Sequence, residues 1–106
     1  MLFRSSLAFN SLNDFCVDKA FIGAGGISLE NGITDHNRDS AELCSAIINR
    51  SRQTILVADS SKFGRDVSAV IGPLSSVKTV ITDSGISKEY ADGLRQMGIE
   101  LIIADV

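Results

Sequence analysis

Residues 55–64, which read ILVADSSKFG, place the tightest constraint on the fold of this chain. The first four are continuously apolar, which is typical of a parallel strand covered on both faces. The polar residues after them would lie at the carboxyl end of that strand, where open α/β sheets bind ligands. The Lys62 ammonium, with the hydroxyls of Ser60 and Ser61 and the loop amides nearby, suits a phosphate. The segment therefore predicts a site for a small phosphorylated molecule.

The rest of the chain alternates strand and helix patterns. The predicted helices cover 39–51 and 87–97, and the predicted strands cover 18–23, 54–58, 67–71, 78–82 and 99–104. Asn37 or Asp39 can cap the first helix. Ser87 can cap the second helix, and Gly98 fits the position just after its end. This order predicts an α/β fold in one domain, with a mainly parallel sheet and flanking helices.

Glycines follow the first predicted strand. Gly25 and Gly26 are adjacent and Gly23 precedes them, so the backbone there can adopt positive φ or be approached closely by another group. Two interpretations stay open: a ligand approaches the bare backbone, or the chain makes a tight exit from the strand. Further on, Asn31 and Gly32 form a strong turn signal between apolar residues.

Composition excludes several classes of protein. The net charge is −3, the isoelectric point is about 4.9 and no basic stripe is visible, so this chain alone should not bind DNA. No apolar run approaches the ~20 residues of a membrane span. The lone His36 has no His or Cys at ligand spacing, so we expect no metal site. Cys16 and Cys44 are expected to be reduced, mostly buried thiols of a cytoplasmic protein.

Six motifs match one family in order and spacing. They are DKAFIGAGGI at 18–27, NGITDHN at 31–37, AEL at 41–43, ADSSKFG at 58–64, GPLSSV at 72–77 and VITDSGI at 80–86. Together they resemble the C-terminal effector-binding domain of DeoR-type bacterial repressors of sugar and polyol operons. The resemblance runs from about residue 15 to the end. Repressors of galactitol, galactosamine or sorbitol operons look most similar.

The resemblance implies a fold related to ribose-5-phosphate isomerase and glucosamine-6-phosphate deaminase. It also implies an oligomeric repressor with an N-terminal winged helix-turn-helix, and only this domain would bind DNA. A phosphorylated sugar or polyol would release the repressor from DNA. From the resemblance we expect both that domain and the first half of the sensor to be missing from this sequence. We therefore expect residues 1–106 to be one partial domain, with a poorly ordered junction at 1–10. Loss of the first half of the sensor should expose one sheet edge and part of an apolar face.

The resemblance also assigns roles around the lysine. Lys62 matches the lysine of the family's DSSK motif and is expected to contact the effector phosphate. Asp59 either orients Lys62 or binds a sugar hydroxyl, and capping of the loop is an equal alternative. Ser60 and Ser61 are expected to cap the loop more than to bind the effector. Phe63 is expected to pack.

Two further acidic positions are candidates for effector contact. Asp35, within residues 34–37, either contacts sugar hydroxyls or belongs to a segment that caps the following helix, whose start would favour an anion. Relatives often carry a basic residue where this chain has Cys44 and Ser45, which weakens any contact from that helix. Asp83 either lines the crevice or begins a turn.

Two other functions remain as alternatives. The related isomerases carry carboxylates in the segment matching residues 20–28, because proton transfer needs a base within reach of the carbon acid. No acid lies between Lys19 and Leu29 in this chain, which argues against an enzyme. We expect no cofactor. The other alternative is a remnant that oligomerises and binds nothing.

Overall fold

The computed structural model describes residues 16–104. The junction expected at 1–10 lies outside the described residues, and so do residues 11–15, where the sequence also allows the end of a helix. The helices are α2 (Arg38–Arg50) and α3 (Lys88–Gln96), with two short 3₁₀ turns, η1 (Ser60–Lys62) and η2 (Leu74–Ser76). The strands are β1 (Val17–Ile22), β2 (Gly26–Ser28), β3 (Gly32–Asp35), β4 (Ser51–Val57), β5 (Ala69–Gly72), β6 (Thr79–Asp83) and β7 (Glu100–Ala104).

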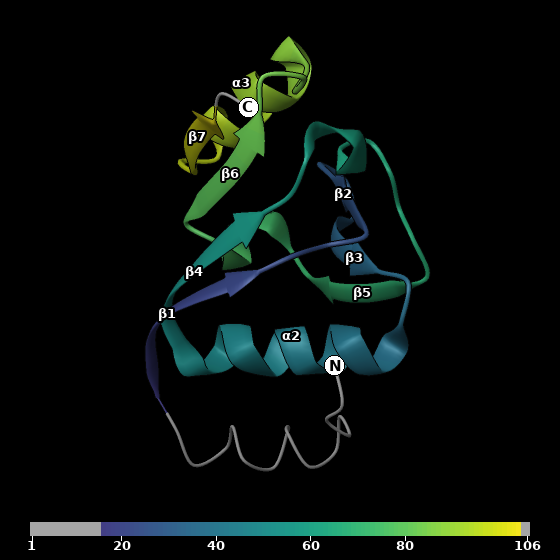
Figure 1. Ribbon diagram of the computed structural model, residues 1–106, viewed down its shortest axis with the longest axis vertical. Coiled ribbons are helices and arrows are strands. Elements are labelled where there is room, and N and C mark those ends of the chain that lie inside the picture. The colour runs from purple at the N-terminus through teal and green to yellow at the C-terminus, as the bar shows by residue number, and fades with distance from the viewer. Residues whose placement is uncertain (1–15, 105–106) are drawn as a thin grey trace.

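The predicted parallel sheet is confirmed. Four strands pair in the order β1-β4-β6-β7, all parallel, and Figure 1 shows them with α2 beside β1 and α3 beside β7. The chain steps across this sheet in one direction. Because parallel crossovers are almost always right-handed, all three connections should lie on one face of the sheet.

The structure adds a second sheet that the predicted order of elements lacked. It is antiparallel, with the order β2-β3-β5. The turn expected at Asn31 and Gly32 is confirmed, since Gly32 has φ +83 and begins β3. The short strand expected at 67–71 exists as β5, but it pairs with β3 in this second sheet. β2 is buried throughout and too short to show a period of two.

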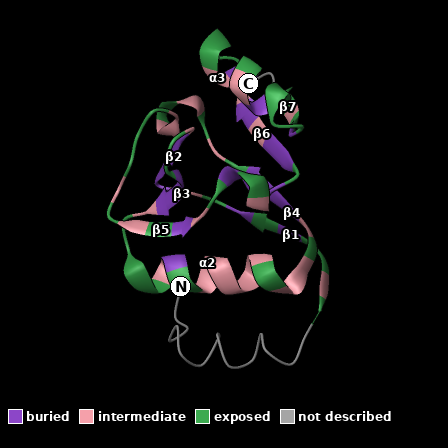
Figure 2. Ribbon diagram, turned by 180° about the vertical axis from the view of Figure 1, so that it is seen from behind, coloured by how far each residue is buried: buried purple, intermediate pink, exposed green. Residues whose placement is uncertain are grey.

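One core holds the two sheets and the helices together. Ile22, Leu56 and Val80 come from the parallel sheet, and Ala41 and Leu94 from the two helices. Figure 2 shows buried residues in strands of both sheets. The second sheet joins it through Ile27, Ile33 and Ile71. At roughly 25 cal/mol per Å² of apolar area, each fully buried side chain of this size contributes about 2 kcal/mol.

The helix ends form as the sequence predicts. The Asn37 side chain accepts a hydrogen bond from the Ser40 amide at 3.0 Å, which selects Asn37 over Asp39 as the cap of α2. Ser87 caps α3 by accepting from the Tyr90 amide at 3.2 Å, and Gly98 has φ +80.

The thiols differ from expectation. Cys44 is half-buried, but Cys16 is exposed, because it precedes β1 at the rim of the sheet. No group of three or more potential metal ligands lies together within residues 16–104. Neither of the described helices is long and apolar enough to cross a membrane.

Candidate functional site

The loop after β4 folds into a tight turn at residues 59–63, which we call the lysine turn. Asp59 caps it by accepting hydrogen bonds from the Ser61 amide, at 2.9 Å, and from the Ser61 hydroxyl. The backbone carbonyls of Asp59 and Ser60 accept from the Lys62 and Phe63 amides. The capping expected of Asp59 and Ser61 is therefore present.

Asp83, at the end of β6, fastens the lysine turn to the sheet. Its Oδ2 accepts a hydrogen bond from the Ser60 amide at 2.9 Å, and its Oδ1 accepts from the Gly85 amide at 2.8 Å. Asp83 thus begins a turn, which is one of the two roles expected of it, and it lies beside the lysine turn at the carboxyl edge of the sheet. Asp59, Ser61, Lys62 and Asp83 come together here.

The two carboxylates of this edge are held in the ionised form. Hydrogen bonds from the Ser61 side chain, then from the Ser61 amide, lower the pKa of Asp59. The Ser60 side chain and amide, followed by the Gly85 amide, lower the pKa of Asp83. Each carboxylate raises the local negative potential, but each already accepts hydrogen bonds from the loop. Further donors, such as sugar hydroxyls, can share their remaining lone pairs.

The Lys62 side chain is half-buried and pairs with none of the described carboxylates within salt-bridge distance. Its charge helps to lower the pKa of Asp59, after the hydrogen bonds from Ser61. An ammonium group that carries no close ion pair keeps its donors for a ligand or water. Among the described residues of the lysine turn, it supplies the positive charge that an anionic ligand would need.

Phe63 anchors the far end of the lysine turn, as expected of a packing residue. Its ring meets Tyr90 of α3 edge to face, with centroids 5.5 Å apart and planes at 62°. Phe63 also bridges to Ile27 of β2, and the Gly64 amide donates to the Ile27 carbonyl at 2.7 Å. Burial, more than any other influence, raises the pKa of Tyr90. The turn is thus tied to both the second sheet and α3.

The segment after β1, residues 23–26, differs from the lysine turn, and we call it the glycine exit. A side chain on Gly26 would meet the Arg65 carbonyl oxygen and, at 2.9 Å, Thr34 Oγ1. A side chain on Gly25 would come within 2.9 Å of the His36 ring. At Gly23 the nearest atom would be the Val57 carbonyl oxygen, 3.9 Å away. Gly25 and Gly26 therefore lie in tightly packed places, whereas a side chain on Gly23 would make only an ordinary contact with β4.

Residues 34–37 form a capping segment. Asn37 caps α2, and the Asp35 carboxylate accepts from the His36 amide at 2.7 Å. Thr34 Oγ1 donates to the Gly26 carbonyl and accepts from the Val67 amide, both at 3.1 Å. Asp35 also raises the pKa of the Cys44 thiol, after the larger effect of burial. Asp35 thus makes its contacts at the start of α2 instead of in the lysine turn.

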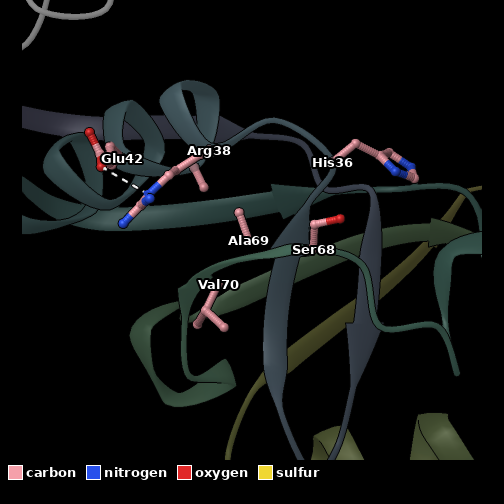
Figure 3. Close-up of a pocket in the computed structure, with 7 residues that line it drawn as sticks. His36, Arg38, Glu42, Ser68, Ala69 and Val70 are labelled. Atoms are coloured by element: carbon pink, nitrogen blue, oxygen red, sulfur yellow. Dashed lines mark ion pairs between the residues drawn. The ribbon is translucent and has the colours of Figure 1, made fainter.

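A shallow cleft of about 550 Å³ opens beside this segment, between α2 and β5 (Figure 3). His36 lies at one end, and Arg38 and Glu42 reach toward each other along α2. Their ion pair of 3.7 Å is exposed, so it contributes little to stability. Ser68, Ala69 and Val70 form the opposite wall. The volume suits a small ligand, but Arg38, the only Lys or Arg among the described residues that line the cleft, is already paired with Glu42.

Sequence reasoning missed a network that fixes the loop following the lysine turn. Asp66 accepts hydrogen bonds from the Ser28 hydroxyl at 2.6 Å and from the Asn31 side-chain amide at 2.9 Å. The Ser28 side chain, then Asn31, lowers the pKa of Asp66. The partners are more than thirty residues apart in the chain. The Asn-Gly turn was visible in the sequence, but nothing local pointed to its partner.

Comparison with known proteins gives the family. The DeoR C terminal sensor domain model matches residues 1–84, and the chain belongs to this family. A putative sgc region transcriptional regulator of Escherichia coli K12 is 39% identical over 98 residues, which cover 92% of this chain and 38% of that protein. A putative aga operon transcriptional repressor of Escherichia coli O157:H7 is 35% identical over 101 residues, covering 95% and 38%.

A third relative is the HTH-type transcriptional repressor GlcR of Bacillus subtilis. It is 33% identical over 104 residues, which cover 98% of this chain and 40% of GlcR. The chain thus spans about two fifths of the length of the curated relatives it matches. These relatives are transcriptional regulators, and the segment they share with this chain is the sensor part.

Proposed function

We propose that this chain is the effector-sensing part of a DeoR-type transcriptional repressor of a carbohydrate or polyol operon, and that its effector is a phosphorylated sugar or polyol. Family membership and the printed names of the relatives support the regulatory role. DNA binding would belong to a part of the longer relatives outside this sequence. A regulator of this kind acts in the cytoplasm and is not an enzyme.

The half-buried Lys62, with no close ion pair at the carboxyl edge of the sheet, carries the proposal. Its ammonium would bind the effector phosphate. The Ser61 amide and hydroxyl would either keep their hydrogen bonds to Asp59 or donate to the phosphate instead. Asp59 and Asp83 would accept hydrogen bonds from sugar hydroxyls, because ionised carboxylates are acceptors only. The Lys62 charge would offset the repulsion between the phosphate and these two carboxylates.

The glycine exit would form the neighbouring wall of this site. Gly23, whose surroundings are open, is the position where an effector would approach the backbone. Gly25 and Gly26 would shape that wall through their packing against His36 and Arg65. Asp35 would act indirectly, by ordering the segment that packs against Gly25.

Binding at the lysine turn would reach the rest of the domain through Phe63. This residue contacts Tyr90 of α3 and Ile27 of β2, so a ligand that orders the turn also biases the position of α3. An effector changes operator affinity only if it binds two arrangements of the repressor with different affinity. The arrangement that changes would be that of the domains or of the subunits.

Calorimetric titration with a panel of sugar and polyol phosphates tests the proposal, with the unphosphorylated compounds in parallel. We expect one phosphorylated compound to bind. Lys62→Ala should weaken its binding by about tenfold or more, because a hydrogen bond to a charged group contributes roughly 1.5–3 kcal/mol. Lys78→Ala is the matched control, since Lys78 is an exposed lysine at the opposite end of β6.

Three results would contradict parts of the proposal. Absence of heat and of any melting shift with every compound would favour a remnant that binds nothing. Equal affinity of wild type and Lys62→Ala, with loss in Arg38→Ala, would move the phosphate to the cleft beside α2. Conversion of a sugar phosphate by the purified chain, detected as proton exchange in NMR spectra, would show that the chain is an enzyme.

A further inference from the structure

The turn between β2 and β3 contains the only Asn-Gly pair of the sequence, Asn31 and Gly32. Asparagine is among the chemically labile residues of proteins. Asn31 is exposed, and Gly32 has φ +83, which glycine adopts without strain. Because glycine lacks a Cβ, no side chain hinders the approach of its backbone nitrogen to the asparagine before it. The other four asparagines are followed by Ser, Asp or Arg, so Asn31 is the one most open to attack by the backbone.

The Asn31 side chain is also a hydrogen-bond donor to a loop far along the chain. Its amide group donates to Asp66 Oδ2 at 2.9 Å, and the Ser28 hydroxyl donates to Oδ1 of the same carboxylate at 2.6 Å. The bond from Ser28, then that from Asn31, lowers the pKa of Asp66, so the carboxylate is ionised and can only accept. This contact therefore requires an N–H donor at position 31.

We propose that Asn31 is a site of spontaneous deamidation, with water as the co-reactant. The Gly32 backbone nitrogen loses its proton to hydroxide and bonds to the side-chain carbonyl carbon of Asn31. The bond from that carbon to the side-chain nitrogen breaks, and the nitrogen takes a proton from water and leaves as ammonia. Water then opens the cyclic imide. Opening at the side-chain carbonyl restores the backbone nitrogen to Gly32 through an isoaspartate or an aspartate link, according to which of the two C–N bonds breaks, and no electrons are transferred.

Either product removes the contact with Asp66. A second carboxylate then stands where the wild-type chain has a donor, so a hydrogen bond is lost and two like charges repel each other. The loop at residues 64–68 follows the lysine turn, and Asp66 fixes it to the second sheet together with the Gly64 amide, which donates to the Ile27 carbonyl. Deamidation should therefore loosen this loop. The inference does not depend on effector binding, so the two can fail separately.

Asp66 should slow the reaction as long as the chain is intact. The Asn31 amide group must leave Asp66 before its carbonyl carbon can turn toward the Gly32 nitrogen. The negative charge of Asp66 also disfavours loss of a proton from a nearby backbone amide. The hydrogen bond that deamidation destroys is thus the one that protects Asn31 from it.

Mass spectrometry of the whole chain, aged in mildly alkaline buffer and digested with trypsin, tests the site. Cleavage after Lys19 and Arg38 gives the peptide 20–38, which contains both Asn31 and Asn37. Asn37 is the matched internal control, because it is exposed like Asn31 but is followed by Arg38. We expect a mixture of aspartate and isoaspartate at position 31, with Asn37 unchanged. Equal conversion at the two positions, or an intact Asn31 after the urea-unfolded chain has converted, would overturn the proposal.

The protection by Asp66 is tested by the rate of the same reaction in two variants. Asp66→Ala should convert Asn31 faster than the wild type, and no faster than the urea-unfolded chain. Asp92→Ala, which removes an exposed carboxylate from α3, is the control and should keep the wild-type rate. Circular dichroism confirms that both variants are folded. A rate in Asp66→Ala equal to or below that of the wild type would show that Asp66 does not protect Asn31.

The consequence for the fold is tested without ageing the protein. Asn31→Asp reproduces the aspartate product and should lower the melting temperature by about 5 °C, because a charge-assisted hydrogen bond is replaced by repulsion. Asn31→Asp combined with Asp66→Asn exchanges donor and acceptor, so it should recover most of that loss. An unchanged melting temperature in the single variant, or no recovery in the double variant, would contradict the effect assigned to deamidation.

Discussion

The two segments that leave the neighbouring strands β1 and β4 are built in opposite ways. The glycine exit is filled by the protein's own atoms, with the Arg65 carbonyl against Gly26 and the His36 ring against Gly25. The lysine turn is held from both ends, by Asp83 and by Phe63, and keeps the Lys62 charge free of close ion pairs. Glycines after a strand can therefore serve packing, while polar residues at the equivalent place remain available for a ligand.

Gly26→Ala should produce the largest effect of any change in these two segments. The added methyl group would meet the backbone of Arg65 and could not be relieved by rotation of a side chain. Overpacking of this kind costs about 3 kcal/mol, and the melting temperature should fall by roughly 15 °C. Thermal unfolding followed by circular dichroism measures it. A melting temperature equal to that of the wild type would show that the glycine exit is open.

Phe63→Ala should come next, and it tests the anchoring of the lysine turn. The change removes the edge-to-face contact with Tyr90 and the packing against the core. Because Phe63 is only half-buried, we expect the free energy of unfolding to fall by about 2 kcal/mol, below the range for a fully buried ring. Urea unfolding gives this value. Phe63→Leu, which keeps most of the apolar volume, should lose less than half as much.

These predictions depend on contacts that the sequence revealed unevenly. The parallel sheet, both described helices, their caps and the turn at Gly32 followed from local signals: continuous apolar runs, helical spacing, Asn37 and Ser87. Such signals act over a few residues and survive in the fold because packing does not oppose them.

The second sheet and its loop contacts did not follow from local signals. β5 looked like any short strand, and its pairing with β3 is decided by tertiary contacts. The Asp66 network joins Ser28 and Asn31 to a loop far along the chain, and no residue spacing in the sequence predicts these hydrogen bonds. At the candidate site, the sequence located the lysine turn, but only the structure separates Gly23, which is open, from Gly26, which is not.

Acid should loosen the attachment of the lysine turn to β6, a smaller effect. The pKa of Asp83 is lower in the fold than in the unfolded chain, so the unfolded chain binds more protons in the range where the two differ. The stabilisation is complete above about pH 4 and is lost as the pH falls through the lower, folded value. Asp83 is partly exposed to solvent, so the change should be modest.

Asp83→Asn isolates this contribution. The asparagine oxygen can still accept one of the two amide hydrogen bonds, but the group no longer titrates. Urea unfolding between pH 7 and pH 3 should therefore show a smaller loss of stability on acidification than in the wild type. Asp92→Asn, on the exposed side of α3, is the control and should follow the wild type. Parallel curves for Asp83→Asn and wild type would contradict the role given to Asp83.

The smallest expected change in stability is also the one that best tests the contrast between the two segments. Gly23→Ala adds a methyl group into open space beside the Val57 carbonyl, and Gly23 does not have positive φ. Its free energy of unfolding should stay within about 0.5 kcal/mol of the wild type. If an effector approaches the backbone at Gly23, the same methyl group must weaken its binding in the calorimetric titration. Unchanged stability with unchanged affinity would confine the effector to the lysine turn, and the glycine exit would then be packing along its whole length.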